Sequence, residues 1–177
     1  NYVLDSLKKN YKDNFSKKLI NKYKKNSNFK VIGMGGSTLG TQTIYEFLKE
    51  TVKKDFVLID NLIQKKSKIK NKQSVNLVIS KSGNTIETVV NSNIYIKRGD
   101  KNIFITENKK NIIRELSKKL KSEVIEHNNY IGGRYSVLSE VGMLPAELMG
   151  LKANKFKQFN VLVRNNAFLN SMVSNVS

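Results

Sequence analysis

The sequence contains no cysteine and no tryptophan, and only one proline and one histidine among its 177 residues. The absence of cysteine excludes disulfide bonds and thiolate metal sites, and the single imidazole, on His127, is too few for a histidine-based zinc centre. Apolar runs such as Phe56–Ile59 are far shorter than the roughly 20 residues that a membrane-spanning helix needs. The first residues contain no hydrophobic signal core. These absences predict a soluble, cytoplasmic protein with no membrane partner, no metal and no cofactor.

The length of the chain suits one hydrophobic core. A chain of this size buries roughly 70% of the surface that it exposes when unfolded. No repeat, low-complexity tract or linker divides the sequence, so residues 1–177 are expected to form a single domain. The chain begins at Asn1 without an initiator methionine, and we therefore expect it to be a piece of a longer protein.

Arginine is scarce although the formal net charge is +18. Only four of the 32 basic residues are arginine, whereas recognition of bases and phosphates favours the bidentate arginine fork. The lysine runs at residues 17–18, 24–25 and 65–68 are expected on the outer faces of helices or in loops. The sequence therefore predicts a solvated basic surface and no nucleic-acid partner.

Short apolar runs alternate with helical patterns along the chain. Residues 4–25 have apolar positions spaced three or four apart, which predicts one amphipathic helix. Residues 135–174 are expected to be mostly helical, with a break near Pro145. The predicted strands are Phe29–Ile32, Phe56–Asp60, Val75–Ser80, Asn102–Thr106 and Glu123–Glu126. The expected fold is α/β: a doubly wound parallel sheet of about five strands flanked by helices, with helical N- and C-terminal extensions.

Glycine concentrates in the turn after the first predicted strand, residues 33–40. The turn brings backbone amides to a helix start without steric hindrance, which favours an anionic ligand near Gly36, Ser37 and Thr38. A tight structural turn is the simpler alternative. A dinucleotide fingerprint with Asp60 as ribose partner fails, because Thr38 occupies the position of its third glycine.

Hydroxyl groups concentrate in the turn after the third predicted strand, residues 80–88. The side chains of Ser80, Ser82 and Thr85 could donate to a phosphate held at the helix N-terminus. The alternative, that Asn84 or Thr85 is an ordinary helix cap, explains one side chain and leaves the other hydroxyls unexplained. We therefore favour a phosphate site here. Lys81 alone is uninformative, because its ammonium could face the ligand or the solvent.

A third segment, residues 132–146, places Arg134 on a glycine pair after the last predicted strand. A guanidinium at this position could stabilise negative charge that develops on a substrate oxygen. It could equally be a structural arginine paired with a carboxylate or a carbonyl group.

Together, the three segments resemble the glucose-6-phosphate isomerase family, whose domains have the sugar-isomerase (SIS) fold. The shared motifs are G-M-G-G-S-x-L-G from residue 33, S-K-S-x-x-T-x-E-T from residue 80 and G-G-R-Y-S-x-x-S-x-V-G from residue 132. The resemblance implies that Arg134 is catalytic and faces a cis-enediolate, and that Lys81 lies beside the substrate. It implies that the phosphate is held by Ser37, Ser80, Ser82 and Thr85. The same motifs add Gly36, Thr38, Gly83, Asn84 and Glu87 to the substrate-binding set. At position 84 the family usually has threonine or serine.

The resemblance also implies an activity, the reversible isomerisation of glucose 6-phosphate and fructose 6-phosphate by proton transfer. The general base in the family is a glutamate of a second SIS domain, and no motif of that domain occurs in this chain. His127 matches no catalytic position of the family. The expected partners are therefore a sugar phosphate and either the missing second SIS domain or a homodimer partner; the alternative function is a non-catalytic sugar-phosphate-binding module. Residues expected to face such a partner are Phe156, Phe159, Val161, Val163, Phe168, Leu169 and Met172.

Overall fold

A five-stranded parallel sheet forms the centre of the computed structural model, which describes residues 2–8, 10–62, 73–158 and 164–175. The strands are β1 (Asn28–Ile32), β2 (Asp55–Ile59), β3 (Val75–Ile79), β4 (Lys101–Thr106) and β5 (Glu123–Glu126). Their order across the sheet is β2-β1-β3-β4-β5. The predicted α/β fold is confirmed, and the predicted strand boundaries agree to within one residue.

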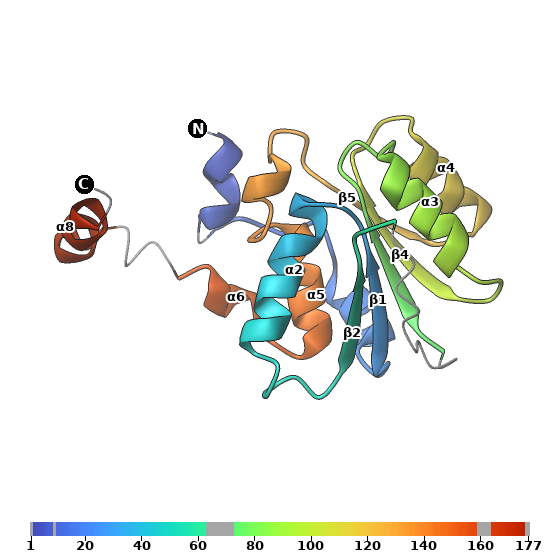
Figure 1. Ribbon diagram of the computed structural model, residues 1–177, viewed down its shortest axis with the longest axis horizontal. Helices are drawn as coiled ribbons and strands as arrows, with labels where there is room; N and C mark the ends of the chain where they lie inside the picture. Colours follow the sequence, from blue (N-terminus) through green and yellow to red (C-terminus); the bar gives the residue numbers. More distant parts are fainter. Residues whose placement is uncertain (1, 9, 63–72, 159–163, 176–177) are drawn as a thin grey trace.

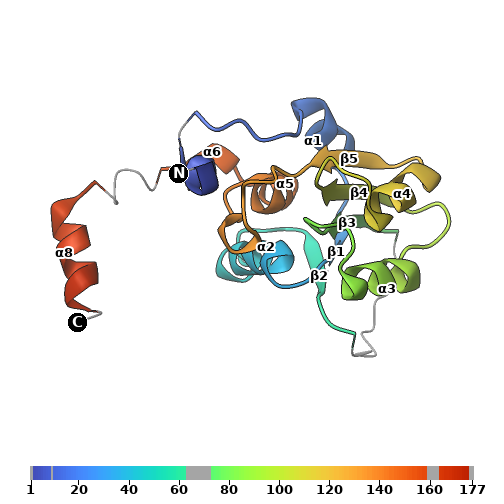
Figure 2. The ribbon, with the colours of Figure 1, turned by 90° about the horizontal axis from the view of Figure 1, so that it is seen from above.

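Helices cover both faces of the sheet, as Figures 1 and 2 show. On one face lie α2 (Gly36–Phe47) and α5 (Glu140–Met149), and on the other lie α3 (Ile86–Tyr95) and α4 (Ile112–Lys119). Each face has its own apolar cluster because side chains alternate along a strand. The first cluster includes Phe29, Val31, Tyr45, Leu77 and Leu144, and the second includes Ile32, Val78, Phe104 and Ile113. Burial on both faces explains why the strands are continuous apolar runs.

The N-terminal segment corrects one prediction, because residues 4–25 do not form a single helix. A 3-10 helix η1 covers Tyr2–Leu7, and α1 begins only at Lys17 and ends at Tyr23. The intervening residues bind the rest of the domain: the Tyr11 hydroxyl donates to the Glu140 carboxylate over 2.9 Å, and Asp13 accepts from Lys157 over 2.8 Å. These long-range contacts outweigh the helical spacing of the apolar residues.

The predicted helix break near Pro145 is wrong, because α5 continues through this residue. Proline has no amide to donate to the carbonyl oxygen four residues earlier, that of Val141. Thr41 on α2 supplies a replacement, with its hydroxyl 3.4 Å from the Val141 oxygen. The helix ends instead at Gly150, whose φ of +97° suits a left-handed C-cap.

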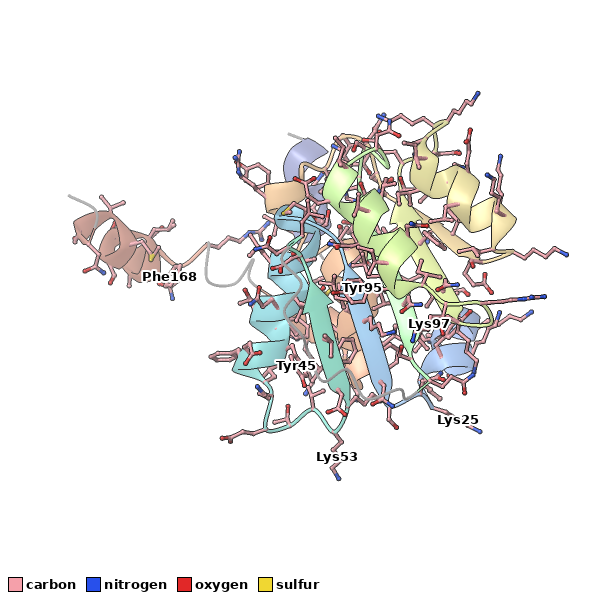
Figure 3. The ribbon with its side chains drawn as sticks, turned by 45° about the vertical axis from the view of Figure 1, so that its right-hand side comes forward. Lys25, Tyr45, Lys53, Tyr95, Lys97 and Phe168 are labelled. Atoms are coloured by element: carbon pink, nitrogen blue, oxygen red, sulfur yellow. The ribbon has the colours of Figure 1, made fainter. Side chains whose placement is uncertain are left out.

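The predicted C-terminal apolar surface is divided between two short helices. Phe156, in α6 (Ala153–Phe156), packs against the first core cluster, whereas Phe168 lies on α8 (Asn166–Ser174), which stands apart from the sheet (Figures 1 and 3). On α8, Phe168, Leu169 and Met172 are 37%, 41% and 52% exposed. The remaining residues of that prediction, Phe159, Val161 and Val163, and the lysine run 65–68 lie outside the described residues. Within the described part of the chain, no helix has the length and apolar character needed to cross a membrane.

Lysine side chains extend from the end of the sheet where the strands begin. Figure 3 shows Lys25 and Lys53 pointing away from the rest of the structure. Lys97, which precedes β4, is also exposed. Exposure of residues 17–18 and 24–25 confirms that these two runs are solvated. The basic side chains that precede β1, β2 and β4 therefore lie at the opposite end of the sheet from the predicted phosphate turn.

Candidate functional site

The two turns predicted to bind a ligand lie at the point where the strand order reverses. The chain passes from β1 to the edge strand β2 and then returns to β3, which pairs with β1 on its other side. In open α/β sheets, ligands bind in the crevice outside the carboxyl ends of the strands at such a point. The turns that follow β1 and β3 lie at this point of the sheet.

Three hydroxyl groups converge in the turn that follows β3. Thr85 Oγ1 lies 3.2 Å from Ser80 Oγ and 3.4 Å from Ser82 Oγ. We call Ser80, Ser82 and Thr85 the hydroxyl cluster. Gly83, with a φ of +68°, turns the chain so that its amide donates to Ser80 Oγ over 3.1 Å. The cluster therefore has a defined geometry at the start of α3.

Among the described residues, no side chain caps the N-terminus of α3. Thr85 occupies the N-cap position, yet its side chain makes no capping hydrogen bond. Asn84 caps a different helix, because its Oδ1 accepts from the amide of Ile112 on α4 over 3.1 Å. Glu87 lies half-buried in the first turn of α3. The amides of this turn and the positive end of the helix dipole thus remain available to an anion.

The turn after β1 brings Ser37 close to the end of β3. A Cβ placed on Gly33 would lie 2.8 Å from the Ile79 oxygen and 3.2 Å from Ser37 Cβ. Ser37 is half-buried, whereas Thr38 is fully buried and its hydroxyl donates to the Gly35 oxygen over 3.2 Å. Ser37 therefore lies beside the end of the strand that leads into the hydroxyl cluster, and Thr38 stabilises the turn from inside.

The glycine at position 36 lets the first and third motifs meet. A Cβ on Gly36 would collide with the Gly133 carbonyl group, and Ser136 Oγ donates to the Gly36 oxygen over 3.3 Å. Only a residue without a side chain allows this approach of two backbones.

We expect Gly36→Ala to destabilise the domain by about 3 kcal/mol, because the added methyl group must displace the Gly133 backbone. The matched control is Gly132→Ala, since a Cβ there meets only Tyr135 Cδ2 at 3.5 Å, an ordinary contact. Urea unfolding of the two variants is the measurement. If the two variants are equally stable, the Gly36 and Gly133 backbones do not lie as close together as described.

Arg134 lies on the short helix η2 (Gly133–Tyr135), which two serine side chains stabilise through hydrogen bonds to the backbone. Ser136 Oγ donates to the Gly133 oxygen and Ser139 Oγ donates to the Ser136 oxygen, each over 2.7 Å. The Arg134 side chain is exposed and makes no hydrogen bond or ion pair with a described residue. The backbone at Arg134 is thus fixed while its guanidinium is available.

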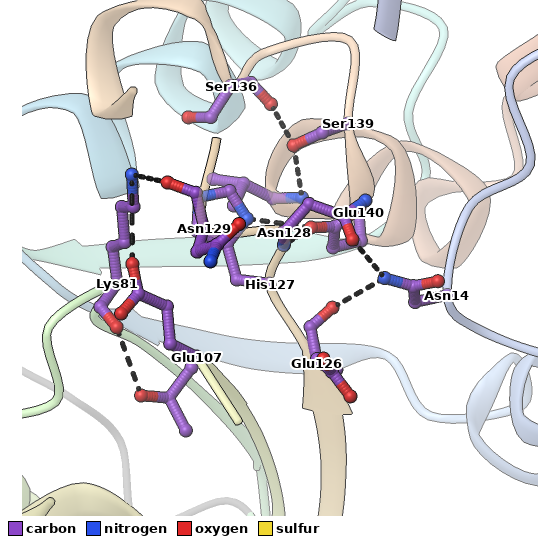
Figure 4. Close-up of polar contacts among 12 residues, drawn as sticks. Asn14, Lys81, Glu107, Glu126, His127, Asn128, Asn129, Ser136, Ser139 and Glu140 are labelled. Carbon is purple, nitrogen blue, oxygen red and sulfur yellow. Dashed lines mark hydrogen bonds and ion pairs between the residues drawn. The ribbon is translucent and has the colours of Figure 1, made fainter. Parts of the chain in front are cut away.

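Lys81 uses its ammonium group within the protein. Its Nζ donates to the Asn129 backbone oxygen over 2.6 Å and lies 3.7 Å from the Glu107 carboxylate (Figure 4). Asn129 follows β5 and precedes Arg134 in the chain. The ammonium therefore connects the turn after β3 with the loop that follows β5.

Sequence reasoning missed a buried polar network at the base of that loop. His127 Nδ1 lies 2.6 Å from Glu140 Oε1, which also accepts from the Asn128 amide over 3.2 Å (Figure 4). The Tyr11 hydroxyl donates to the other carboxylate oxygen. His127 and Glu140 are 2% and 0% exposed, so both lie in the interior of the protein. The sequence did contain a signal for this network: Glu140 begins the mostly apolar segment that forms α5, and a carboxylate buried there needs partners.

The network changes two pKa values in opposite directions. Burial raises the pKa of Glu140, but hydrogen bonds from His127, the backbone and Tyr11, with the charge of His127, outweigh it and leave the pKa below its ordinary value. Burial and the neighbouring Glu140 carboxylate raise the pKa of Tyr11. Glu140 is therefore held as a carboxylate and Tyr11 as a hydroxyl donor. No group of three His, Asp or Glu side chains that could hold a metal ion occurs in the described ranges.

Residues 3–172 match the family model described as phosphoglucose isomerase. The glucose-6-phosphate isomerase of Methanocaldococcus jannaschii is 33% identical over 92% of this chain and 45% of its own length. That of Acholeplasma laidlawii is 38% identical over 71% of the chain and 34% of its own length. The chain therefore spans less than half the length of these relatives.

Solved structures share the fold. A hypothetical protein from Thermus thermophilus aligns with a TM-score of 0.70 and 22% identity over 79% of this chain and 38% of its own. The tagatose-6-phosphate ketose/aldose isomerase of Escherichia coli aligns with a TM-score of 0.61 and 13% identity, over 88% and 47%. The family match and the five-stranded SIS-type fold lead to one conclusion. The chain belongs to the phosphoglucose isomerase family.

Proposed function

We propose that the chain binds a phosphorylated sugar at the carboxyl end of the sheet, between the turns after β1 and β3. The observation that carries the proposal is the hydroxyl cluster in front of an α3 N-terminus that no described side chain caps. Hydroxyl donors, free amides and a helix dipole together suit a phosphate group. Relatives named glucose-6-phosphate isomerase make glucose 6-phosphate and fructose 6-phosphate the expected ligands.

In this proposal the chain is the phosphate-holding part of an aldose-ketose isomerase. Ser37 and the hydroxyl cluster hold the phosphate, and Arg134 faces the negative charge of the cis-enediolate. The reaction also needs a general base over C1 and C2. The buried carboxylates Glu107 and Glu140 are already paired, and the resemblance places the base in a second SIS domain, so we assign the base to sequence beyond this chain.

The missing part would be a second SIS domain or a second copy of the chain. The exposed apolar side chains of α8 are candidates for the surface that it covers. We also propose a cytoplasmic location, which a chain without cysteine fits. The alternative, a module that binds sugar phosphates without turning them over, differs only in lacking a partner that supplies the base.

Calorimetric titration with fructose 6-phosphate tests the binding site, with fructose and inorganic phosphate as comparison ligands. We expect saturable binding that is strongest for the sugar phosphate. Ser82→Ala should weaken it about tenfold, because one hydrogen bond to a charged group is lost. Ser82 is exposed, so the variant should fold normally.

Ser122→Ala is the control, since Ser122 precedes β5 at the other end of the sheet and its hydroxyl donates, among the described residues, only to the Leu120 oxygen. It should bind like the unmodified protein. Equal binding of every polyanion, or no effect of Ser82→Ala, would contradict the proposed site.

A further inference from the structure

Glu107 is a buried carboxylate at the carboxyl end of the sheet that none of the three motifs contains. It directly follows β4 and is 8% exposed. Its amide donates to the Lys81 oxygen over 3.1 Å, and its side chain lies 3.7 Å from Lys81 Nζ and 2.5 Å from Lys109 Nζ. A buried carboxylate is costly unless cations or donors compensate it, and these two lysines supply the compensating charge.

The two lysines differ in what they can do for the site. Lys109 points outward, with a side chain 56% exposed, and such a pair contributes little by itself. The Lys81 side chain is 30% exposed and its ammonium also donates to the Asn129 oxygen. Lys81 is therefore the link through which Glu107 reaches another loop.

The contacts Glu107–Lys81–Asn129 connect the loops that follow β4, β3 and β5 at the carboxyl end of the sheet (Figure 4). Lys81 lies between Ser80 and Ser82 of the hydroxyl cluster. Asn129 belongs to the loop that carries Arg134. The ammonium thus joins the turn proposed to hold the phosphate to the loop proposed to face the sugar.

We propose that Glu107 is a positioning residue that, through Lys81, fixes the distance between the hydroxyl cluster and the Arg134 loop. The negative charge of Glu107 holds the Lys81 ammonium at the Asn129 oxygen. Without that charge, a long and partly exposed lysine side chain turns toward solvent or toward a bound phosphate, and the loop loses its tether. This inference rests on the proposed function, because it assigns the two loops to two ends of one sugar phosphate.

The test compares Glu107→Gln, Lys81→Met and their combination, with Lys109→Met as the matched control. Each variant is titrated with fructose 6-phosphate and with inorganic phosphate. Both single variants should weaken sugar-phosphate binding about tenfold and leave inorganic phosphate binding within about twofold, since the phosphate alone spans only the cluster. The double variant should be no weaker than Lys81→Met, because both changes remove one link.

A conservative replacement of Lys81 distinguishes its role as a link between loops from a role as a direct ligand of the phosphate. Lys81→Arg should restore binding of fructose 6-phosphate, since a guanidinium also donates to a carbonyl oxygen and pairs with a carboxylate. Lys109→Met should bind like the unmodified protein. Loss of inorganic phosphate binding in Lys81→Met would overturn the proposal, because it would make Lys81 a direct phosphate ligand.

Amide hydrogen exchange tests the tether without any sugar. We expect the amides of residues 128–135 to exchange about tenfold faster in Glu107→Gln and Lys81→Met, and unchanged in Lys109→Met. If the unmodified protein does not bind fructose 6-phosphate, the proposed function fails, and the exchange rates still decide whether the tether exists. The inference is wrong if the amides of residues 128–135 exchange at an unchanged rate in Glu107→Gln. It is also wrong if they exchange faster but the variant still prefers fructose 6-phosphate over inorganic phosphate to the same extent.

Discussion

Replacement of Glu140 by alanine is expected to lower the free energy of unfolding by about 3 to 5 kcal/mol. The carboxylate is fully buried and is the common acceptor for His127, Tyr11 and the Asn128 amide. Its removal leaves the buried His127 and the half-buried Tyr11 hydroxyl and Asn128 amide without their acceptor. It also removes the hydrogen bond by which Tyr11 ties the N-terminal segment to the start of α5. Denaturant unfolding followed by circular dichroism gives the measurement.

The stabilisation by Glu140 should depend on pH. The pKa of Glu140 in the folded protein is lower than its ordinary value of 4.5, so the unfolded chain binds the proton more readily. The contribution is therefore complete above the ordinary pKa and disappears as the pH falls through the lower, folded value. The difference in stability between the unmodified protein and Glu140→Ala should shrink between neutral pH and about pH 3.

Glu126→Ala is the matched control, because Glu126 ends β5 nearby and is exposed. It should change the stability by no more than about 0.5 kcal/mol at any of these pH values. If Glu140→Ala lowers the free energy of unfolding by less than about 1 kcal/mol, or by an amount that does not vary with pH, the Glu140 network does not stabilise the fold as proposed.

The strands and turns were predictable because their causes are local. A strand buried on both faces is an apolar run, and the glycines and hydroxyls of the ligand turns stand next to each other in the sequence. The hydroxyl cluster needs only six residues of chain, from Ser80 to Thr85, to form its contacts. Such a site can be inferred from a motif before the fold is known.

The N-terminal and Pro145 predictions failed because the deciding partners are distant in sequence. Tyr11 has helical spacing relative to its neighbours, but its hydroxyl binds a carboxylate 129 residues away. Pro145 breaks a helix on local rules, but Thr41 approaches the Val141 oxygen that the proline leaves without its amide donor. Glu107 was overlooked for the same reason, since its link to Asn129 passes through Lys81 and requires three loops to be adjacent.

Arg134→Ala is expected to weaken binding of an anionic enediolate analogue of the sugar phosphate about 100-fold. The reason is that a guanidinium aimed at developing charge favours the reaction intermediate over the substrate. Binding of fructose 6-phosphate should fall much less, and inorganic phosphate should bind as before. The stability should not change, because the exposed Arg134 side chain makes no hydrogen bond or ion pair with a described residue. Calorimetric titration with the three ligands provides the comparison.

Arg98→Ala is the matched control, since Arg98 is another exposed arginine and precedes β4 at the opposite end of the sheet. It removes the same charge from the whole chain, so any general electrostatic attraction falls equally in both variants. Specific recognition therefore requires that Arg134→Ala alone loses the preference for the enediolate analogue. If both variants weaken all three ligands to the same extent, the net charge of +18 and not the Arg134 guanidinium accounts for anion binding. A preference that survives in Arg134→Ala would move the stabilisation of the enediolate to sequence beyond this chain, together with the general base.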